Sequence, residues 1–287
     1  MNFDGFIDEI KKKDWNIYGV EVYEDLKLTH EWGDTKDTPH EIFSCTKTVL
    51  SIAVGIAYDR GLFDLDKNIF DYIPEEIYKK YDSKIIEDLR KLSIRRLLTM
   101  SVPGYPFRPE GKSYLDFCFS LPVQDPDNNS FYYCNICPYY VGLALNFAVG
   151  EDLWEFIDRE IIKPLDIDVD YYYRDPDGYF FGASMMRMTL HEISKLGILL
   201  YNKGVYNGKR ILSEEYVDMA TSVQIENDRY GYGFYIWKYK DGFYISGKWG
   251  QHCLVLRDEK LIVTFTGYLP DEAEDVENSM IKHILEE

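Results

Sequence analysis

Cysteine and histidine are both scarce in this chain, which has 287 residues and five of each. An odd number of cysteines cannot all pair with one another, and a reducing compartment would leave them as thiols. We therefore expect free thiols rather than a disulfide framework. The cysteines are Cys45, Cys118, Cys134, Cys137 and Cys253.

Long apolar runs are also missing. The longest, from Val49 to Tyr58, is interrupted by Ser51 and falls far short of the roughly 20 residues that span a bilayer. The first residues, MNFDGFIDEIKKKDW, are charged and amphipathic, without the apolar segment and cleavage site of a signal peptide. These features predict a cytoplasmic protein that does not interact with membranes.

Positive charge is in deficit, with 32 Lys and Arg against 50 Asp and Glu, a formal charge of −18 and a pI near 4.7. Such a chain repels phosphate backbones, so nucleic acid is not expected as a partner. Hydrophobic residues make up 46% and aromatic residues 16%, which is typical of a globular protein with a sizeable core. We expect its ligand to be a small molecule.

Two common kinds of site lack their sequence signals. The histidines are scattered and no Gly-x-Ser-x-Gly elbow is present, which disfavours a Ser-His-Asp hydrolase. Cys134 and Cys137 have the spacing of a metal or redox half-site, but a second pair is absent. We therefore predict no metal and no cofactor; a redox function would require a reversible disulfide between these two cysteines.

Hydrophobic periodicity predicts an α+β fold. Residues 17–32 form two β-rich runs around Glu24 and Asp25, typical of a hairpin, and strand patterns return at 230–239, 241–256 and 260–268. Helices are expected from Ser44 to Gly61, at 189–203 behind a capping box, and at about 271–286. The early and late strands most simply share one antiparallel sheet flanked by helices. We predict a sheet subdomain from 1–64 and 186–287, and an inserted, mainly helical subdomain from 65–185.

The helix from Ser44 carries Lys47 three positions on, so both side chains lie on one face. A serine at a helix N-terminus sits beside free N–H groups that favour developing negative charge. A nearby amine held neutral by burial can accept its proton. Taken alone, the pair also fits an N-cap serine followed by a lysine whose stem packs on the helix.

Two further motifs follow in order, Tyr133-Cys134-Asn135 and Lys248-Trp249-Gly250. With Ser44-x-x-Lys47 they resemble the three motifs of serine β-lactamases and penicillin-binding proteins. The stretches GLFDLDKNIFDYIPE (61–75) and LLTMSVPG (97–104) also resemble that family, and the resemblance runs from about residue 17 to 268. Tyr-x-Asn indicates the branch of class C β-lactamases, D-alanyl-D-alanine carboxypeptidases and esterases, and implies a β-lactamase/transpeptidase-like fold with the active site between the two subdomains.

The resemblance implies a role for each motif residue. Ser44 would attack a carbonyl and become the acyl ester, while Lys47 and Tyr133 would share the removal of its proton. Asn135 would orient Lys47 and hold the substrate's amide oxygen. Lys248 would lower the pKa of Tyr133 or Lys47 by its charge. Next to Gly250, the backbone N–H of Gln251 would form the oxyanion hole together with that of Ser44.

Trp249 departs from the family pattern, because the related lactamases and peptidases usually carry a threonine there that helps bind the substrate carboxylate. The sequence thus predicts a serine hydrolase that forms an acyl-enzyme on Ser44 and cleaves a small ester, amide or peptide. The alternative, from another functional class, is a binding or regulatory module that keeps the fold but has lost turnover.

Overall fold

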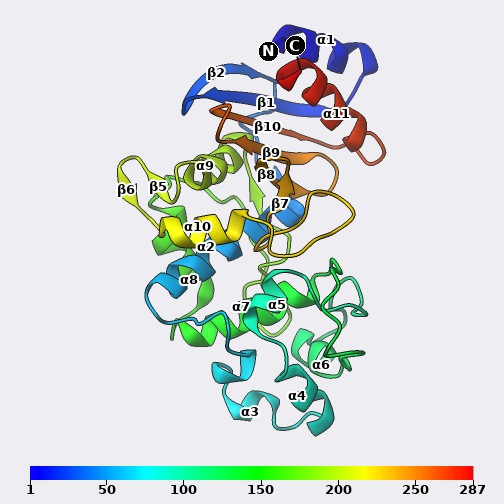
Figure 1. Cartoon of the computed structure of the whole chain (residues 1–287), viewed down its shortest axis with the longest axis vertical. Helices are drawn as coiled ribbons and strands as arrows, with labels where there is room; N and C mark the ends of the chain where they lie inside the picture. Colours follow the sequence, from blue (N-terminus) through cyan, green and yellow to red (C-terminus); the bar gives the residue numbers. More distant parts are fainter. Residues whose placement is uncertain (287) are drawn as a thin grey trace.

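A six-stranded antiparallel sheet with the strand order β2-β1-β10-β9-β8-β7 lies at one end of the molecule (Figure 1). The computed structural model describes residues 1–286. The strands of this sheet are β1 (Ile17–Glu24), β2 (Lys27–Trp32), β7 (Trp237–Tyr239), β8 (Gly242–Gly247), β9 (Gln251–Leu256) and β10 (Leu261–Gly267). Two-stranded sheets are formed by β3 (His40–Glu41) with β4 (Arg187–Met188), and by β5 (Val205–Tyr206) with β6 (Lys209–Arg210).

The first strand of the chain lies beside the last. Strand β1 pairs antiparallel with both β2 and β10, and Val22 is opposite Val263 in the β10 pairing. The predicted hairpin over 17–32 is confirmed, as is the prediction that early and late strands share one sheet. The number of late strands differs from the prediction, because four strands occupy the region in which the sequence indicated three.

The added strand arises because the segment 241–256 is interrupted. Strand β8 ends at Gly247 and β9 begins at Gln251. Between them Trp249 and Gly250 have φ values of +63° and +88°, which a continuous strand does not allow. The prediction that Lys248 lies on a strand was therefore wrong, because Lys248 opens this turn. In the segment 230–239, only Trp237–Tyr239 forms a strand.

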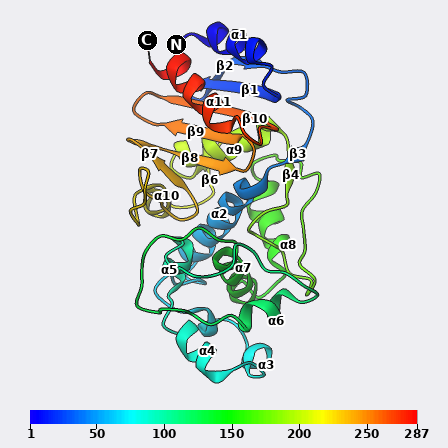
Figure 2. The same cartoon turned by 90° about the vertical axis from the view of Figure 1, so that its right-hand side faces the viewer.

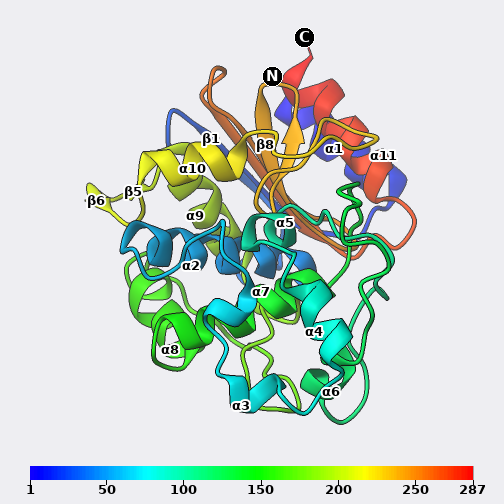
Figure 3. The same cartoon turned by 60° about the horizontal axis from the view of Figure 1, so that its bottom comes forward.

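Helices cover both faces of the sheet. Helices α1 (Phe3–Lys13) and α11 (Ala273–Met280) lie side by side on the outer face, where Phe6, Ile10 and Val276 pack against β-strand residues (Figures 1 and 3). A π-helical turn, η4 (Ile281–Leu285), continues α11. Helix α9 (Leu190–Tyr201) covers the inner face and begins with the predicted capping box of Thr189 and Glu192.

Helix α2 (Thr46–Asp59) runs between the sheet and the remaining helices (Figure 2). It is buried over nearly its whole length, as its apolar pattern predicted, and Gly61 follows its end with φ +68°. The α-helix begins two residues later than expected, because Ser44 belongs to a preceding 3₁₀ turn, η1 (Phe43–Cys45).

Residues 65–185 contribute helices and no strand to the six-stranded sheet. We keep 65–185 as a proposed helical subdomain. Between residues 1 and 286, no helix combines the length and the apolar character needed to cross a bilayer. The remaining helices of the chain are η2 (Ile69–Asp71), α3 (Glu75–Tyr78), α4 (Ser83–Leu89), α5 (Ile94–Leu98), α6 (Tyr114–Phe119), α7 (Ile136–Ala148), α8 (Leu153–Ile157), η3 (Asp158–Ile162) and α10 (Glu214–Thr221).

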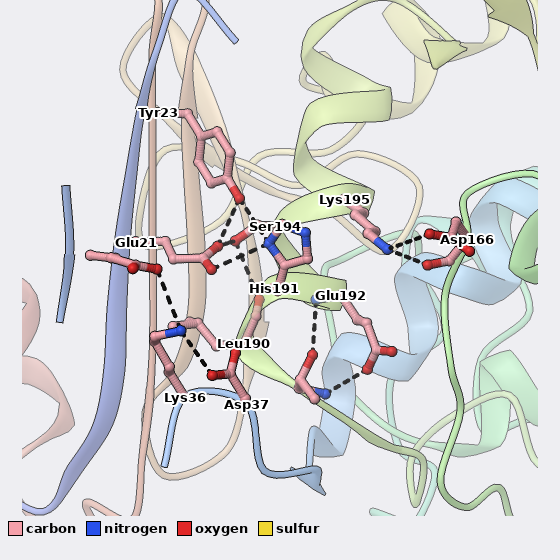
Figure 4. A network of polar contacts seen from close by, with 12 residues as sticks. Glu21, Tyr23, Lys36, Asp37, Asp166, Leu190, His191, Glu192, Ser194 and Lys195 are labelled. Carbon is pink, nitrogen blue, oxygen red and sulfur yellow. Dashed lines mark hydrogen bonds and ion pairs between the residues drawn. The ribbon is translucent and has the colours of Figure 1, made fainter. Parts of the chain in front are cut away.

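A buried carboxylate links the sheet to α9. Glu21 on β1 is 2% exposed; its Oε2 accepts hydrogen bonds from Tyr23 OH at 2.9 Å and Ser194 Oγ at 2.7 Å, and its Oε1 lies 3.3 Å from His191 Nδ1 (Figure 4). Burial by itself would raise the pKa of Glu21, but the contacts with His191, Ser194 and Tyr23 outweigh it and hold the pKa below its usual value. The pKa of His191 is raised, chiefly by its hydrogen bond to Glu21.

We expect Glu21→Gln to lower the free energy of unfolding by roughly 1–3 kcal/mol. Ionised Glu21 contributes to the free energy of unfolding above its unfolded-state pKa, and this contribution disappears as pH falls through its folded-state pKa. Protonated His191 contributes fully below its unfolded-state pKa, and its contribution disappears as pH rises through its raised folded-state pKa. The deficit should therefore be largest between about pH 5 and 6.5 and smaller at about pH 8. Urea unfolding of wild type and Glu21→Gln at these pH values measures this difference in the free energy of unfolding. Glu31→Gln, an exposed carboxylate on β2, is the control, and a deficit independent of pH would contradict the ionic interpretation.

Candidate active site

The turn that carries Ser44 is pressed against the end of β8. A Cβ atom at Gly247 would lie 2.3 Å from the carbonyl oxygen of Ile42, so only glycine permits this approach. Cys45 Sγ lies 3.8 Å from the carbonyl oxygen of Gln251, at the start of β9. The ends of two adjacent strands thus lie beside η1, and the half-buried Ser44 is held next to the turn at 248–250.

Lys47 is buried one turn after Ser44, with 1% of its surface exposed. Its Nζ lies 3.0 Å from Ser44 Oγ, 2.7 Å from Asn135 Oδ1 and 2.7 Å from the carbonyl oxygen of Ala183. A neutral amine has two N–H donors and one lone pair. The two carbonyl oxygens can accept both hydrogens, which leaves the lone pair directed at the Ser44 hydroxyl.

The charge state of Lys47 follows from its burial. Desolvation lowers the pKa of Lys47 to about 7, against the weaker opposing influence of the neighbouring cysteines Cys134, Cys45 and Cys137. Near neutral pH a substantial fraction of the side chain is therefore unprotonated and able to act as a base. Desolvation is the main cause of this lowering, and the electrostatic role of Lys248 toward Lys47 stays a prediction.

Asn135 comes from the N-terminus of α7, where it is the N-cap residue and is 5% exposed. Its backbone N–H donates a hydrogen bond to the carbonyl oxygen of Phe107 at 2.6 Å, which holds the backbone of Asn135 in place. The structure therefore brings Asn135 to Lys47 across 88 positions of sequence.

Tyr133 closes the site beside Lys47, whose Nζ lies 5.0 Å from the centre of the phenol ring. The ring stacks on Trp237, with the ring centres 5.6 Å apart. Burial raises the pKa of Tyr133 well above its usual value, and an interaction with Ser44 offsets this only partly. The expected lowering of this pKa by Lys248 was wrong, because desolvation dominates and Tyr133 stays protonated at neutral pH.

The third motif forms the opposite wall. Lys248 Nζ lies 4.1 Å above the Trp249 ring, and that ring meets Phe43 and Tyr268 edge-on at 5.1 Å and 5.0 Å. The Gln251 side chain is buried, and its Nε2 donates to the carbonyl oxygen of Gly267 at 2.6 Å. Trp249 is therefore a fixed aromatic wall, whereas the side-chain amide of Gln251 is held by Gly267 and does not line the cavity.

A cavity of about 310 Å³ opens at Ser44. Four predicted site residues line it, Ser44, Asn135, Lys248 and Trp249, whereas Lys47, Tyr133, Gly250 and Gln251 do not. The sequence did not indicate the other lining residues, which are Glu41, Phe43, Phe107, Arg108, Pro109, Tyr114, Phe181, Ser184 and Met185. Five of the thirteen lining residues are aromatic and three are charged, so the cavity offers apolar surface for an acyl or leaving group beside charged side chains.

The carbonyl of Ala183 is the functional contact that sequence reasoning missed. A backbone acceptor has no side-chain signature, and Ala183 is 136 positions from Lys47. The Cys134 and Cys137 sulfurs lie 3.6 Å apart as buried free thiols at the start of α7. Within residues 1–286 no cluster of His, Cys, Asp and Glu has the arrangement of a metal site.

Comparison with known proteins places this geometry in context. A family model described as Beta-lactamase matches residues 18–279. The 6-aminohexanoate-dimer hydrolase of Paenarthrobacter ureafaciens is 21% identical over 209 residues, which are 65% of this chain and 51% of that protein. The chain thus spans about half the length of this relative.

Two solved structures show the same fold. A Bacillus anthracis protein assigned as a 6-aminohexanoate-dimer hydrolase has a TM-score of 0.79 and 19% identity, with 96% of this chain and 80% of that chain covered. A class C β-lactamase of Rhodobacter sphaeroides has a TM-score of 0.75 and 16% identity, with 98% of each chain covered. The predicted α+β fold of the β-lactamase/transpeptidase type is confirmed.

Proposed function

The chain belongs to the beta-lactamase family, and we propose that it is a serine hydrolase that forms an acyl-enzyme on Ser44 and hydrolyses a small ester or amide. One observation carries this proposal. Lys47 is buried, its pKa is lowered to about 7, and its two carbonyl acceptors leave a lone pair for the Ser44 hydroxyl 3.0 Å away. A lysine that only packed on the helix would not need this environment.

In the proposed reaction, Ser44 Oγ attacks the substrate carbonyl carbon while its proton passes to Lys47 Nζ. The backbone N–H groups of Ser44 and Gln251 would stabilise the resulting oxyanion, an arrangement that typically contributes roughly 10²–10³-fold per donor. Collapse forms the acyl ester and expels the leaving group, which takes the proton from Lys47. Water then attacks the ester, and its proton returns to Ser44 through Lys47. The protonated Tyr133 would donate a hydrogen bond near the leaving group.

Amides are included beside esters because of the relatives. The name of the Paenarthrobacter ureafaciens protein gives a dimer of an amino acid as its substrate. The class C β-lactamase shares the fold. The aromatic rings of five of the thirteen lining residues favour a small substrate with an apolar part.

Incubation with a fluorophosphonate tests the proposal. We expect intact-mass spectrometry to show one adduct per chain, and peptide mapping to place it on Ser44, because Lys47 activates only this hydroxyl. Ser184→Ala, which removes a second hydroxyl from the same cavity, should still be labelled, and Ser44→Ala should not. An inert Ser44 would favour the alternative, a binding or regulatory module without turnover.

Trp249 is expected to decide between neutral and carboxylate-bearing substrates. Its ring is packed between Phe43 and Tyr268 and presents no compact hydroxyl to a carboxylate. Losing a hydrogen bond to a charged group costs roughly 1.5–3 kcal/mol, or about 10- to 150-fold. Wild type should hydrolyse a short p-nitrophenyl ester more efficiently than a chromogenic cephalosporin, and Trp249→Thr should shift the kcat/KM ratio toward the cephalosporin by about tenfold or more. A ratio left unchanged would assign carboxylate binding to another residue, such as Lys248.

A further inference from the structure

A second cavity, of about 250 Å³, lies on the outer face of the sheet and shares no lining residue with the cavity at Ser44. Strands β8 and β9 form its floor, α11 forms one wall, and the chain around residues 229–239 forms the other. Its lining includes Arg229, Tyr230, Tyr239, His252, Glu274 and Glu277. The hydrolysis of an ester or amide at Ser44 needs none of them.

Opposite charges line this cavity, and the pKa of Arg229 is raised chiefly by Tyr244 and to a smaller degree by Glu277 and Glu274. Arg229 Nη1 donates only to Tyr244 OH, at 3.3 Å, and the part of the chain that is described contains no ion pair between Arg229 and either Glu274 or Glu277. Glu274 has no hydrogen-bond or ion-pair partner within residues 1–286. Glu274 is exposed, so its carboxylate and the guanidinium of Arg229 can both reach a ligand without first breaking an ion pair with each other.

His252 adds a buried polar atom at the floor. It is 4% exposed, and its ring stacks between Tyr244 and Phe265 at centre-to-centre distances of 4.9 Å and 5.2 Å. Its Nδ1 lies 3.3 Å from Glu277 Oε1 without the geometry of a hydrogen bond, and neither ring nitrogen has a hydrogen-bond partner within residues 1–286. A buried polar atom without a hydrogen-bond partner is unfavourable, so a ligand that supplied a partner would be held more tightly.

Most of the remaining lining is apolar or aromatic, and Asn278 is its polar member. The rings of Tyr230 and Tyr239 meet edge-on at 5.3 Å, and Leu254, Met280 and Ile281 add apolar surface. A simple anion would face two carboxylates, and a simple cation would face Arg229. Neither would use the apolar surface. A molecule with a carboxylate, an ammonium group and an apolar side chain meets all three requirements.

We propose that this cavity binds a small amino acid with an aromatic or branched aliphatic side chain. The carboxylate pairs with Arg229, the ammonium group pairs with Glu274, and the side chain packs on Tyr230 and Tyr239. Nε2 of His252 supplies a further hydrogen-bonding position, while Glu277 remains with Nδ1 of the same ring. The inference does not depend on Ser44 being a nucleophile.

Isothermal titration calorimetry tests this site. The probes are L- and D-phenylalanine and L-leucine, with 3-phenylpropionate and 2-phenylethylamine as analogues that each carry a single charge. We expect saturable binding of at least one amino acid, and binding of either analogue to be weaker by about tenfold or more, because each loses one charge-assisted contact. No saturable binding of any of the three amino acids up to about 10 mM, which corresponds to a binding free energy weaker than roughly 3 kcal/mol, would overturn the proposal.

Substitutions locate the binding. Arg229→Gln and Glu274→Gln should each weaken binding of the amino acid by about tenfold, whereas Asp275→Asn, on the same helix but outside the cavity, should leave it within about twofold. Thermal unfolding close to that of wild type shows that the variants fold. Binding that survives both cavity substitutions would place the amino acid elsewhere, for example at Ser44, and would refute the site.

Discussion

Ser44→Ala is expected to reduce hydrolysis of any substrate found for this protein by roughly 10³-fold or more, since loss of an attacking nucleophile removes the whole covalent route. The fold should be unaffected. Ser44 lies in the 3₁₀ turn η1, and its hydroxyl caps neither that turn nor α2, so its removal leaves no helix end unsatisfied. Steady-state kinetics on a p-nitrophenyl ester, with urea unfolding of both proteins, measures the two effects.

Ser184→Ala is the matched control for this experiment, because Ser184 lines the same cavity but does not contact Lys47 Nζ among the described hydrogen bonds. Its activity should stay within a few-fold of wild type. If Ser44→Ala retained turnover within about tenfold of wild type, the acyl-enzyme on Ser44 would be refuted.

Lys47→Arg should be nearly as damaging as loss of the serine, although it keeps a positive charge at the position. A guanidinium stays protonated and cannot accept the proton of Ser44, and its planar fork does not match the three acceptors around Nζ. In wild type, kcat/KM should rise with pH through about 7 as Lys47 loses its proton, because the unprotonated amine is the active form. A pH–rate profile from about pH 5 to 9 in both proteins measures this.

Lys47→Met separates the loss of function from loss of the fold. The pKa of Lys47 is lower in the folded protein than in the unfolded chain, so unfolding takes up a proton between about pH 7 and 10.4 and stability rises with pH in that window. The methionine variant should be inactive, should be at least as stable as wild type near neutral pH, and should lack this dependence. An active arginine variant would mean that Lys47 supplies only charge and is not the base.

Short-range features of this protein were readable from the sequence because they depend on residues close together in the chain. The spacing of Ser44 and Lys47 places them on one face of a turn of helix, and the 3.0 Å contact between Nζ and Oγ follows from that spacing. The capping box at Thr189 and the hairpin around Glu24 and Asp25 are equally local. The assignment of β1 and β10 to a single sheet, by contrast, came from the order of the predicted elements along the chain, for which one antiparallel sheet flanked by helices is the simplest arrangement.

Contacts between distant segments were decided only by the tertiary structure. The carbonyl of Ala183 reaches Lys47 because the chain folds back over α2, and no side chain marks that position in advance. Burial, which no single residue encodes, lowers the pKa of Lys47 and raises that of Tyr133, where the motifs had suggested an effect of Lys248. The sequence therefore determined which groups could react. Their protonation states, and the charges that line the cavity beneath α11, depend on desolvation and on long-range packing, which exist only once the sheet and helices have assembled.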